Sequence, residues 1–534
     1  MTSSSTTSIT SVHRVEDFLA TVSRHALCII ASRLNNNIPC HSPPSICIPT
    51  FGTFNIVIPL HFSTGEKWIA RIPRPGRIFA SPNPDFLGRI MQSMVATTNL
   101  VRQETSIPTP RIYGWSAIED NEVGAPYMLM DYMEGVSLGD CLQSLGYEKT
   151  VDILFQWASY VWELTCLQFP SIGCLGPSSS RDRVYVKKFL SQGSVDQGRD
   201  RTSEALFRGP YTSVSDYLYG ISNLKKSAPV DGMSYDRFSF GTYLESFIPY
   251  VLRPELNKGP FVLCHDDFNV QNILIDPVEG RITAIIDWDF AAVKPVQSLL
   301  AFPESLRWDI LSPFSPSTYE PYQIEWSRRF RPVFAHALLL ASTDIDTGLE
   351  VDVSALLKDS PFYTQLERGL GDAWREGETL KLVGKMVYGG NSGDMLRWAA
   401  QTMRLGPWMT AYGERAGYSS PFNGAGVEVY SLPPKPSAVV MMAARMGRGL
   451  QTPDVDEAKV TVAPVSAIGN VPGKKVTKQG CEWRDKFLQR KRLKKIFARL
   501  CRNSSDDSLE LKARMINQPA MKQGRWWTRL ARRS

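Results

Sequence analysis

Residues 261–295 decide the fold, and they read FVLCHDDFNVQNILIDPVEGRITAIIDWDFAAVKP. Two strand-like runs, Ile273–Asp276 and Ile282–Ile286, flank a turn that contains Pro and Gly, so the segment predicts a β-hairpin. Because a hairpin brings its two ends together, Asn272 and Asp287 are expected to lie close in space. The sequence therefore predicts a polar site at the open end of this hairpin.

A second acid, Asp267, lies on the predicted loop that enters the hairpin and can reach the same point. Two carboxylates and one amide make an oxygen-rich site of the kind that suits a hard cation such as Mg²⁺. An ordinary hairpin with polar ends is the alternative that these residues leave open.

The spacing His265-x-Asp267-x₄-Asn272, followed by the tripeptide Ile-Asp-Trp at 286–288, resembles the catalytic core of the aminoglycoside phosphotransferase and choline kinase superfamily, including its fungal members. The resemblance implies an α+β, bilobal, protein-kinase-like fold with a small β-rich N-lobe and a larger, mainly helical C-lobe. It also implies that Asp267 is the catalytic base and that Asn272 and Asp287 hold Mg²⁺. His265 would brace the catalytic loop.

A second predicted hairpin, with strands at Ile56–Phe62 and Trp68–Ile72, lies far upstream. In the resembled family this hairpin covers the phosphates of the nucleotide, which is ATP or GTP. Gly52 and Asn55 lie in the loop before it, where backbone N–H groups can cradle phosphate oxygens. Arg71 occupies the position at which protein kinases carry a phosphate-binding Lys.

The strand-like run Tyr127–Asp131 and the following Tyr132 resemble the hinge between the lobes, where the adenine would bind. Leu87–Glu104 predicts a helix, and relatives carry on it a Glu that pairs with the basic residue of the hairpin. Alignment with the family pattern places Met94 at that Glu. Another acid serves instead, or Arg71 works unpaired, or the site is impaired.

Composition excludes several classes of protein. The 534 residues are 43% hydrophobic, which is ordinary for a globular protein. Nine cysteines, an odd number without a C-x-x-C pair, argue against a disulfide framework or a zinc module. We expect no transmembrane segment and no secretory signal, and therefore a cytoplasmic location.

The net charge of +7 conceals an asymmetry. Residues 431–534 carry 23 Lys and Arg against 8 Asp and Glu, whereas residues 1–430 are mildly acidic. Within this tail, Cys481–Leu500 predicts a basic amphipathic helix. We expect an anionic partner for the tail: a membrane surface, an acidic protein or nucleic acid. A nuclear or peripheral membrane location through this tail is the alternative to a purely cytoplasmic one.

The predicted organisation has four parts. They are a disordered N-terminus at 1–14, a nucleotide-binding N-lobe at 15–133, a catalytic and acceptor-binding C-lobe at 134–425 with a flexible insertion at 178–208, and a mostly disordered basic tail at 426–534 with its amphipathic helix at 481–500. Further helices are expected at Val15–Leu34, at Val151–Phe169, at Phe238–Leu252 and within 320–418.

The sequence thus predicts an ATP-dependent phosphotransferase that acts on a hydroxyl of a small molecule. A catalytically impaired, nucleotide-binding pseudokinase or interaction protein on the same fold is the alternative that Met94 raises. Protein kinase activity is less favoured, because no Ala-Pro-Glu motif follows Asp287.

Overall fold

The computed structural model describes residues 17–43, 50–51, 55–74, 85–177, 184–189, 208–226, 244–245, 247–312 and 318–371. Several predictions therefore lie outside the described residues: the N-terminus at 1–14, Gly52 in the phosphate loop, the tail at 426–534 and its helix at 481–500.

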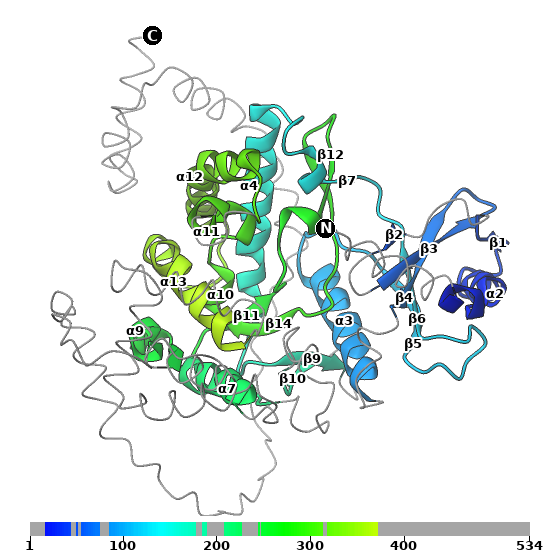
Figure 1. The fold of residues 1–534 in the computed structure, drawn as a ribbon, viewed down its shortest axis with the longest axis horizontal. Helices are drawn as coiled ribbons and strands as arrows, with labels where there is room; N and C mark the ends of the chain where they lie inside the picture. The colour runs from blue at the N-terminus through cyan, green and yellow to red at the C-terminus, as the bar shows by residue number, and fades with distance from the viewer. Residues whose placement is uncertain are drawn as a thin grey trace, which may run out of the picture. The chain divides into compact units, whose positions relative to one another are not determined.

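The N-terminal region is built on a six-stranded antiparallel sheet in the order β1-β3-β4-β6-β5, with β2 paired to β3. Its strands are β1 (Cys40–His41), β2 (Thr50–Phe51), β3 (Asn55–Phe62), β4 (Lys67–Pro73), β5 (Ile112–Ser116) and β6 (Tyr127–Asp131). Helices α2 (Arg24–Leu34) and α3 (Asp85–Glu104) lie on opposite sides of this sheet (Figure 1). The ranges predicted from the sequence for β3, β4, β6 and α3 are confirmed, with small differences in their ends.

Side-chain alternation along β4 directs Arg71 away from α2. Trp68, Ala70 and Ile72 are buried in the hydrophobic cluster that includes α2, whereas Ile69 packs against the larger cluster that includes α3. Because successive side chains of a strand point to opposite faces, Arg71 shares the α3 side of the sheet with Ile69.

Residues 261–295 form a closed unit. Strand β11 (Phe261–Cys264) pairs with β14 (Ala292–Pro295), and β12 (Ile273–Asp276) pairs with β13 (Arg281–Ile285). The loop from β11 to β12 and the loop from β13 to β14 therefore connect the same two pairs of strands and run close to each other. The Ile286 N–H donates to the Asn272 carbonyl oxygen at 3.0 Å, which joins the two loops. The predicted hairpin is confirmed, whereas β14 is a strand that the sequence analysis does not predict.

The C-terminal region is mainly helical (Figure 1). Its helices are α4 (Tyr147–Glu163), α7 (Val214–Lys226), α9 (Ile248–Val251), α10 (Val296–Leu299), α11 (Trp308–Leu311), α12 (Pro321–Asp344) and α13 (Val353–Gly371). Short strands complete it: β7 (Val136–Ser137) pairs with β12, β8 (Gln168–Phe169) pairs with β11, and β9 (Cys174–Pro177) pairs with β10 (Val184–Lys187). Helix α4 packs along α12 and against β13, which holds the β12–β13 hairpin on the helical layer.

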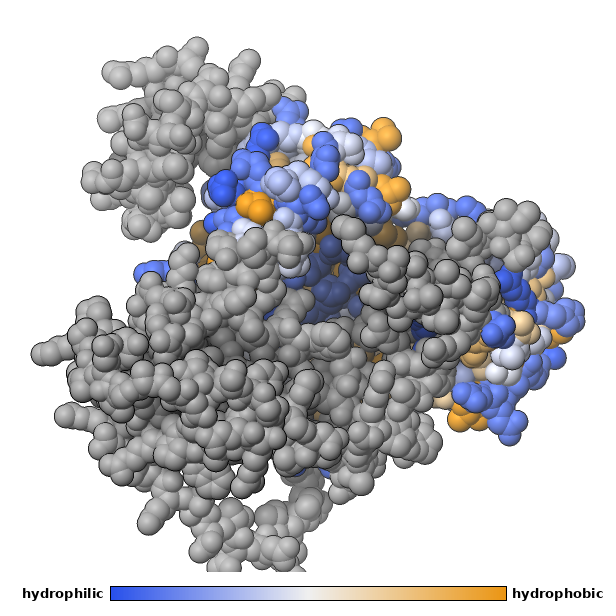
Figure 2. Space-filling model, in the orientation of Figure 1, coloured by the Kyte–Doolittle hydropathy of each residue, from blue (hydrophilic) through white to orange (hydrophobic). Residues whose placement is uncertain are grey.

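The larger hydrophobic cluster runs through α3, the catalytic strands and the C-terminal helices, so one core supports both sides of the site. Trp157, Trp288 and Phe334 are completely buried within it. On the face drawn in Figure 2, the described residues that reach the surface are mostly hydrophilic, with scattered hydrophobic side chains. Most of the large apolar side chains of these elements are thus buried in internal packing.

Two predicted helices differ from the structure. The helix expected at Val15–Leu34 is divided, because the Ser23 hydroxyl accepts the Ala26 N–H at 3.2 Å and caps a new helix, α2. The helix expected at Val151–Phe169 ends at Glu163, and its last predicted residues form β8 instead. Pairing with β11, a strand that lies far along the chain, overrides the local helical pattern there.

Two further predictions fall only partly within the described residues. Within the helix expected at Phe238–Leu252, residues 244–245 are helical and residue 247 is a turn before α9, which carries Pro249 near its start; residues 238–243 and 246 lie outside the described residues. The insertion expected to be flexible at 178–208 contains β10 and the buried Phe189, which bridges to Arg208. Residues 178–183 and 190–207 lie outside the described residues.

The predicted fold class is confirmed for the described residues: an α+β, kinase-like arrangement of a β-rich N-lobe and a mainly helical C-lobe. The two lobes are joined after β6, where the backbone of Gly135 has a φ of +136° that side-chain-bearing residues rarely adopt. A Cβ at this position would lie 2.4 Å from Thr283 Oγ1 and 3.0 Å from the Ile275 carbonyl oxygen. The connection between the lobes therefore requires glycine.

We expect Gly135→Ala to lower the free energy of unfolding by roughly 2–5 kcal/mol, because it adds both backbone strain and a steric clash. Gly348→Ala is the matched control: Gly348 also has a positive φ, of +67°, but no atom lies within 4 Å of the added Cβ. That control should cost only about 1 kcal/mol. Chemical denaturation of both variants measures the difference, and equal losses would contradict the clash.

Candidate active site

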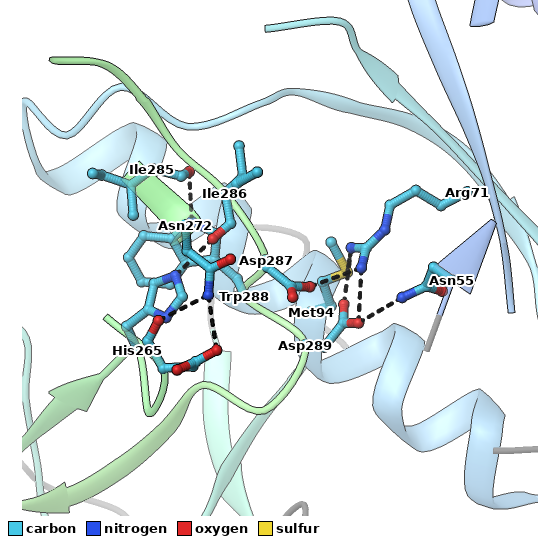
Figure 3. A network of polar contacts seen from close by, with 11 residues as sticks. Asn55, Arg71, Met94, His265, Asn272, Ile285, Ile286, Asp287, Trp288 and Asp289 are labelled. Atoms are coloured by element: carbon cyan, nitrogen blue, oxygen red, sulfur yellow. Dashed lines mark hydrogen bonds and ion pairs between the residues drawn. The ribbon is translucent and has the colours of Figure 1, made fainter. Parts of the chain in front are cut away.

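Arg71 of β4 binds two acids that follow β13. Its Nη1 and Nη2 donate to Asp289 Oδ1 and Oδ2 at 3.0 and 2.9 Å, and Nη2 also donates to Asp287 Oδ1 at 2.8 Å (Figure 3). The side chains of Arg71 and Asp289 are only 12% and 9% exposed, whereas that of Asp287 is 40% exposed. Asp289 is thus the buried, two-pronged partner of the guanidinium, and Asp287 is a partner that solvent can reach.

The surroundings of this ion group explain the substitution that the sequence analysis identifies. Met94 of α3 is buried, and its Sδ lies 3.5 Å from Arg71 Nη1. The Asn55 side-chain amide donates to Asp289 Oδ2 at 3.0 Å. Met94 therefore does face Arg71, and Arg71 is not unpaired, because another acid, Asp289, pairs with it.

Burial and pairing act in opposite directions on these groups. Burial raises the pKa of the Asp289 carboxyl, and the contacts with Arg71 and Asn55 oppose that shift. Burial acts to lower the pKa of Arg71, but the carboxylates of Asp289 and Asp287 outweigh it and raise that pKa above its ordinary value. The guanidinium therefore stays charged, and its buried charge depends on these acids.

The catalytic loop holds Asp267 in place through two asparagines. Asn272 Nδ2 donates to both the carbonyl oxygen and Oδ2 of Asp267, each at 2.9 Å. Asn269 Nδ2 donates to Asp267 Oδ1 at 3.2 Å, and the Ser305 N–H in turn donates to Asn269 Oδ1 at 3.0 Å. Asp267 itself is exposed. The structure thus joins the predicted base to the predicted metal ligand Asn272 and leaves its carboxylate accessible.

The buried His265 connects the β11–β12 loop to the β13–β14 loop. The ring is 2% exposed, and its Nε2 lies 2.9 Å from the Ile286 carbonyl oxygen, next to Asp287. The ring of Trp288 packs against it with centroids 4.4 Å apart, and Trp288 Nε1 donates to the Ile285 carbonyl oxygen at 3.1 Å. Burial lowers the pKa of His265, so the neutral ring with Nε2–H as donor is favoured.

A second buried ion group anchors the catalytic loop from the C-lobe side. Asp266, whose backbone φ is +68°, pairs with Lys294 of β14, and Lys294 Nζ also lies 3.7 Å from Glu367 Oε1 of α13. Burial acts to lower the pKa of Lys294, and the two acids raise it well above its ordinary value. The residue before Asp267 is thereby tied both to β14 and to α13.

The chemistry of the donors fits a magnesium ion. The amide nitrogen of Asn272 donates to Asp267, and its amide oxygen lies on the side that faces Asp287 (Figure 3). Asp287 has a left-handed backbone, with φ +68°, which Asp tolerates better than most residues. The described residues contain no cluster of three or more His, Cys, Asp or Glu side chains. One carboxylate and one amide suit Mg²⁺, which usually keeps waters and phosphate oxygens as its other ligands.

Of the remaining predicted residues, Asn55 joins this group and Tyr132 lies apart from it. Asn55 begins β3 and contacts Asp289, and Gly52 is outside the described residues. Tyr132 follows β6; its N–H donates to the Lys67 carbonyl oxygen at 3.2 Å, and its side chain is exposed. Because Arg71 pairs with Met128 in the β4–β6 register, Tyr132 lies four residues along, roughly 13 Å from the level of Arg71.

Three residues of the site escape the sequence analysis as functional residues: Asp289 as the partner of Arg71, and Asp266 and Lys294 as the anchor. Two of them carry a signal in the sequence: Asp289 replaces an acid, often Glu, that the resembled family has just after the Trp, and Lys294 is a charged residue inside the apolar run at 291–296. The partners of Asp289 and Asp266 are set by the packing of distant segments, which the pattern of residues does not reveal.

Comparison with known proteins supports the resemblance to a phosphotransferase family. The model of the family described as "Phosphotransferase enzyme family" matches residues 242–298, the segment that contains the catalytic loop, the hairpin and Asp287. The resemblance predicted from the sequence is therefore confirmed over its strongest part, and it supports a phosphotransferase activity. The match covers about a tenth of the chain, so the substrate is a separate question.

Two fungal relatives are similar over longer stretches. A protein of Aspergillus fumigatus described as a subtelomeric hrmA-associated cluster protein is 25% identical over 352 residues, 54% of this chain and 67% of the relative. The clavilactone A biosynthesis cluster protein Y of Ampulloclitocybe clavipes is 26% identical over 230 residues, 41% of this chain and 54% of the relative. Neither name states a reaction.

Solved structures of phosphotransferases are also similar. An aminoglycoside phosphotransferase of Streptomyces rimosus has 13% identity and a TM-score of 0.33, covering 66% of this chain and 100% of that chain. A macrolide 2′-phosphotransferase of Brachybacterium faecium has 14% identity and a TM-score of 0.31, covering 66% and 96%. Similarity at this level carries no argument about function.

We expect His265→Asn to flatten the pH dependence of stability on the acid side. The pKa of His265 is lowered by folding, so the unfolded chain binds the proton more readily, and stability is full above about pH 6.5 and falls as the pH decreases. Each unit of pKa shift corresponds to about 1.4 kcal/mol of this loss. Denaturation at pH 5 to 8 measures it, with Phe268→Leu, a non-titrating ring neighbour, as the control. Equal pH slopes for wild type and His265→Asn would contradict the neutral buried histidine.

Proposed function

We propose that the protein is an ATP- or GTP-dependent phosphotransferase that moves the γ-phosphate to a hydroxyl of a small molecule. One observation carries this proposal: two adjacent loops present Asp267, Asn272 and Asp287 together, and Arg71 reaches the same point from the N-lobe sheet. This set of groups is what phosphoryl transfer requires, since its catalysis is mostly positioning and neutralisation of charge.

Asp267 is the proposed base. Its carboxylate is exposed and is held by Asn272 and Asn269, so it can accept the proton of an acceptor hydroxyl without rearranging. His265 fixes the loop from below as a neutral donor and does not compete for that proton.

Asn272 and Asp287 are the residues that would hold Mg²⁺, and the ion would neutralise charge on the phosphate oxygens when bound. Asp287 suits this role because it is partly exposed and makes a single bond to Arg71. Arg71 would orient the phosphates with its charge, and Tyr132 marks the adenine end of the same β4–β6 pair.

The proposed function assigns a role to each lobe of the chain. We place the nucleotide-binding N-lobe at 15–133 and the catalytic, acceptor-binding C-lobe at 134–425. The acceptor would be a small molecule with a hydroxyl group, and an anionic partner of the basic tail and a cytoplasmic location remain predictions. Among the residues that the structure describes, no helix combines the length and apolar character needed to cross a membrane.

A nucleotide-binding pseudokinase is the second candidate, and the apolar Met94 beside Arg71 is the observation that favours it. Pairing of Arg71 with Asp289 weakens this candidate, because the guanidinium keeps an acidic partner without an acid at position 94. The two candidates differ in turnover and agree in nucleotide binding.

We expect Asp267→Asn and Asp287→Asn each to reduce kcat by at least about 10²-fold while the protein stays folded, because one removes the base and the other a metal ligand. Glu279→Gln, an exposed acid at the opposite end of the same hairpin, is the control and should keep full activity. The measurement is nucleotide consumption with a panel of small alcohols, alongside thermal unfolding. Retained turnover in either Asn variant would refute the assignment.

We expect Mg-ATP at about 100 times its dissociation constant to stabilise the wild-type protein by about 2.7 kcal/mol, because binding to the folded state shifts the unfolding equilibrium. Thermal unfolding with and without Mg²⁺ measures it, and Mg-GTP tests the choice of nucleotide. Binding without turnover on any acceptor would favour the pseudokinase, and absence of binding would exclude both candidates.

A further inference from the structure

The helix beside Arg71 offers no acid. In α3, acids occur only at the two ends, Asp85 and Glu104, nine and ten residues from Met94. At 1.5 Å per residue, each end is roughly 14 Å along the helix from the point that faces Arg71. The residues of α3 that line the small space next to Arg71 are Leu87, Ile90, Met91 and Met94, all apolar.

A guanidinium in such a position needs a carboxylate from elsewhere. Removing one partner of a buried ion pair typically costs about 3–5 kcal/mol, because the other charge remains buried without compensation. Asp289 meets the need with both of its oxygens, and it comes from a segment 218 residues away in the chain. The polar contact that the structure shows between Arg71 and α3 is with the Met94 sulfur.

The two acids that contact Arg71 are not equivalent. Asp289 is buried, makes two bonds to the guanidinium and accepts a third from Asn55. Asp287 is more exposed and makes one bond to the guanidinium. When a metal and a nucleotide bind, Asp287 can leave Arg71 at little cost, whereas Asp289 cannot.

We propose that Asp289 is the positioning residue for Arg71, and that it does from the metal-binding loop what an acid on α3 would otherwise do. The inference rests on the proposed function, because the purpose of holding Arg71 is to present its charge to the phosphates. Asp287 is then the exchangeable partner, which passes from Arg71 to the metal. Asn55 belongs to the same device, since it fixes Asp289 from the start of β3.

The consequence is a direct connection between the lobes. Arg71 and Asn55 belong to the N-lobe sheet, and Asp289 follows Asp287 by two residues in the C-lobe segment. The position of the phosphate-binding charge is therefore set by the metal-binding loop itself and does not require α3 to move an acid into place.

The test moves the acid to the helix. Asp289→Asn removes the charge while it keeps the shape of the side chain, and we expect it to weaken Mg-ATP binding by about 10–100-fold. It should also lower Tm by several degrees. Adding Met94→Glu should restore most of both losses, because Glu resembles Met in length and position 94 already faces Arg71. In the wild-type background the same Met94→Glu change should be harmful, since a further buried acid then competes for one guanidinium.

The expected result is thus a change of sign: Met94→Glu is harmful with Asp289 and beneficial without it. Met94→Gln, which has the same shape without charge, is the control and should not rescue Asp289→Asn. If Asp289→Asn does not fold, recovery of folded protein in the double variant with Glu, and not in the one with Gln, is the same result. The proposal is overturned if Met94→Glu is equally harmful in both backgrounds, or if Asp289→Asn changes neither Tm nor binding. It is also overturned if the double variant regains stability but not Mg-ATP affinity, because Asp289 then acts through the metal.

Two readouts separate this inference from the proposed function. The Tm of the nucleotide-free variants tests the pairing of Arg71 with Asp289 whether or not the protein binds nucleotide. A wild-type protein that does not bind Mg-ATP would refute the proposed function, whereas binding by the wild type without the change of sign would refute only the role of Asp289.

Discussion

Burial of the Arg71 guanidinium is the constraint on which the rest of the site depends. A charge that is removed from water must be neutralised by groups that the fold holds in place. Here those groups follow β13, so the ion pairs hold β4 of the N-lobe against the loop after the β12–β13 hairpin. The same contact that stabilises the buried charge aligns β4 with the loop that carries Asp287, the residues to which phosphate and metal binding are assigned in the proposed function. Stability of the fold and the proposed catalysis thus both require Arg71 to be paired with these acids.

The loops themselves are aligned by strand pairing. Because β11 pairs with β14 and β12 with β13, the β11–β12 loop and the β13–β14 loop both run from one strand pair to the other. The contact of His265 with the Ile286 carbonyl oxygen fixes the distance between these two loops. The pair of Asp266 and Lys294 then connects the loop of Asp267 to β14 and to the long C-lobe helix α13. The neighbours of Asp267 are held on both sides: Asp266 pairs with Lys294, and Phe268 packs against the larger hydrophobic cluster and the His265 ring.

How much of this could be predicted from the sequence depended on distance along the chain. The hairpin β12–β13 and the strand β6 are specified by local alternation and turns, and they were predicted almost to the residue. Strand β14 was missed, and the end of α4 was extended too far, because both depend on pairing with β11, which no local pattern encodes. Met94 could be placed opposite Arg71, because the sequence of its helix could be aligned with the pattern of the resembled family. The acid that replaces the missing Glu could not be found in this way, because 218 residues separate it from Arg71.

Formal charge connects the ion group to the proposed metal. Within the contacts described, Arg71 contributes one positive charge against the two carboxylates of Asp287 and Asp289, which leaves one negative charge uncompensated. The exposed Asp267, which Asn272 joins to the same point, adds a second. Two unbalanced carboxylates beside an amide oxygen favour a divalent cation over a monovalent one, since only the former neutralises both. An acid on α3 in addition to Asp289 would place a further negative charge next to Arg71. Met94 and Asp289 together thus give Arg71 one buried carboxylate partner, which comes from the loop after β13 and not from α3.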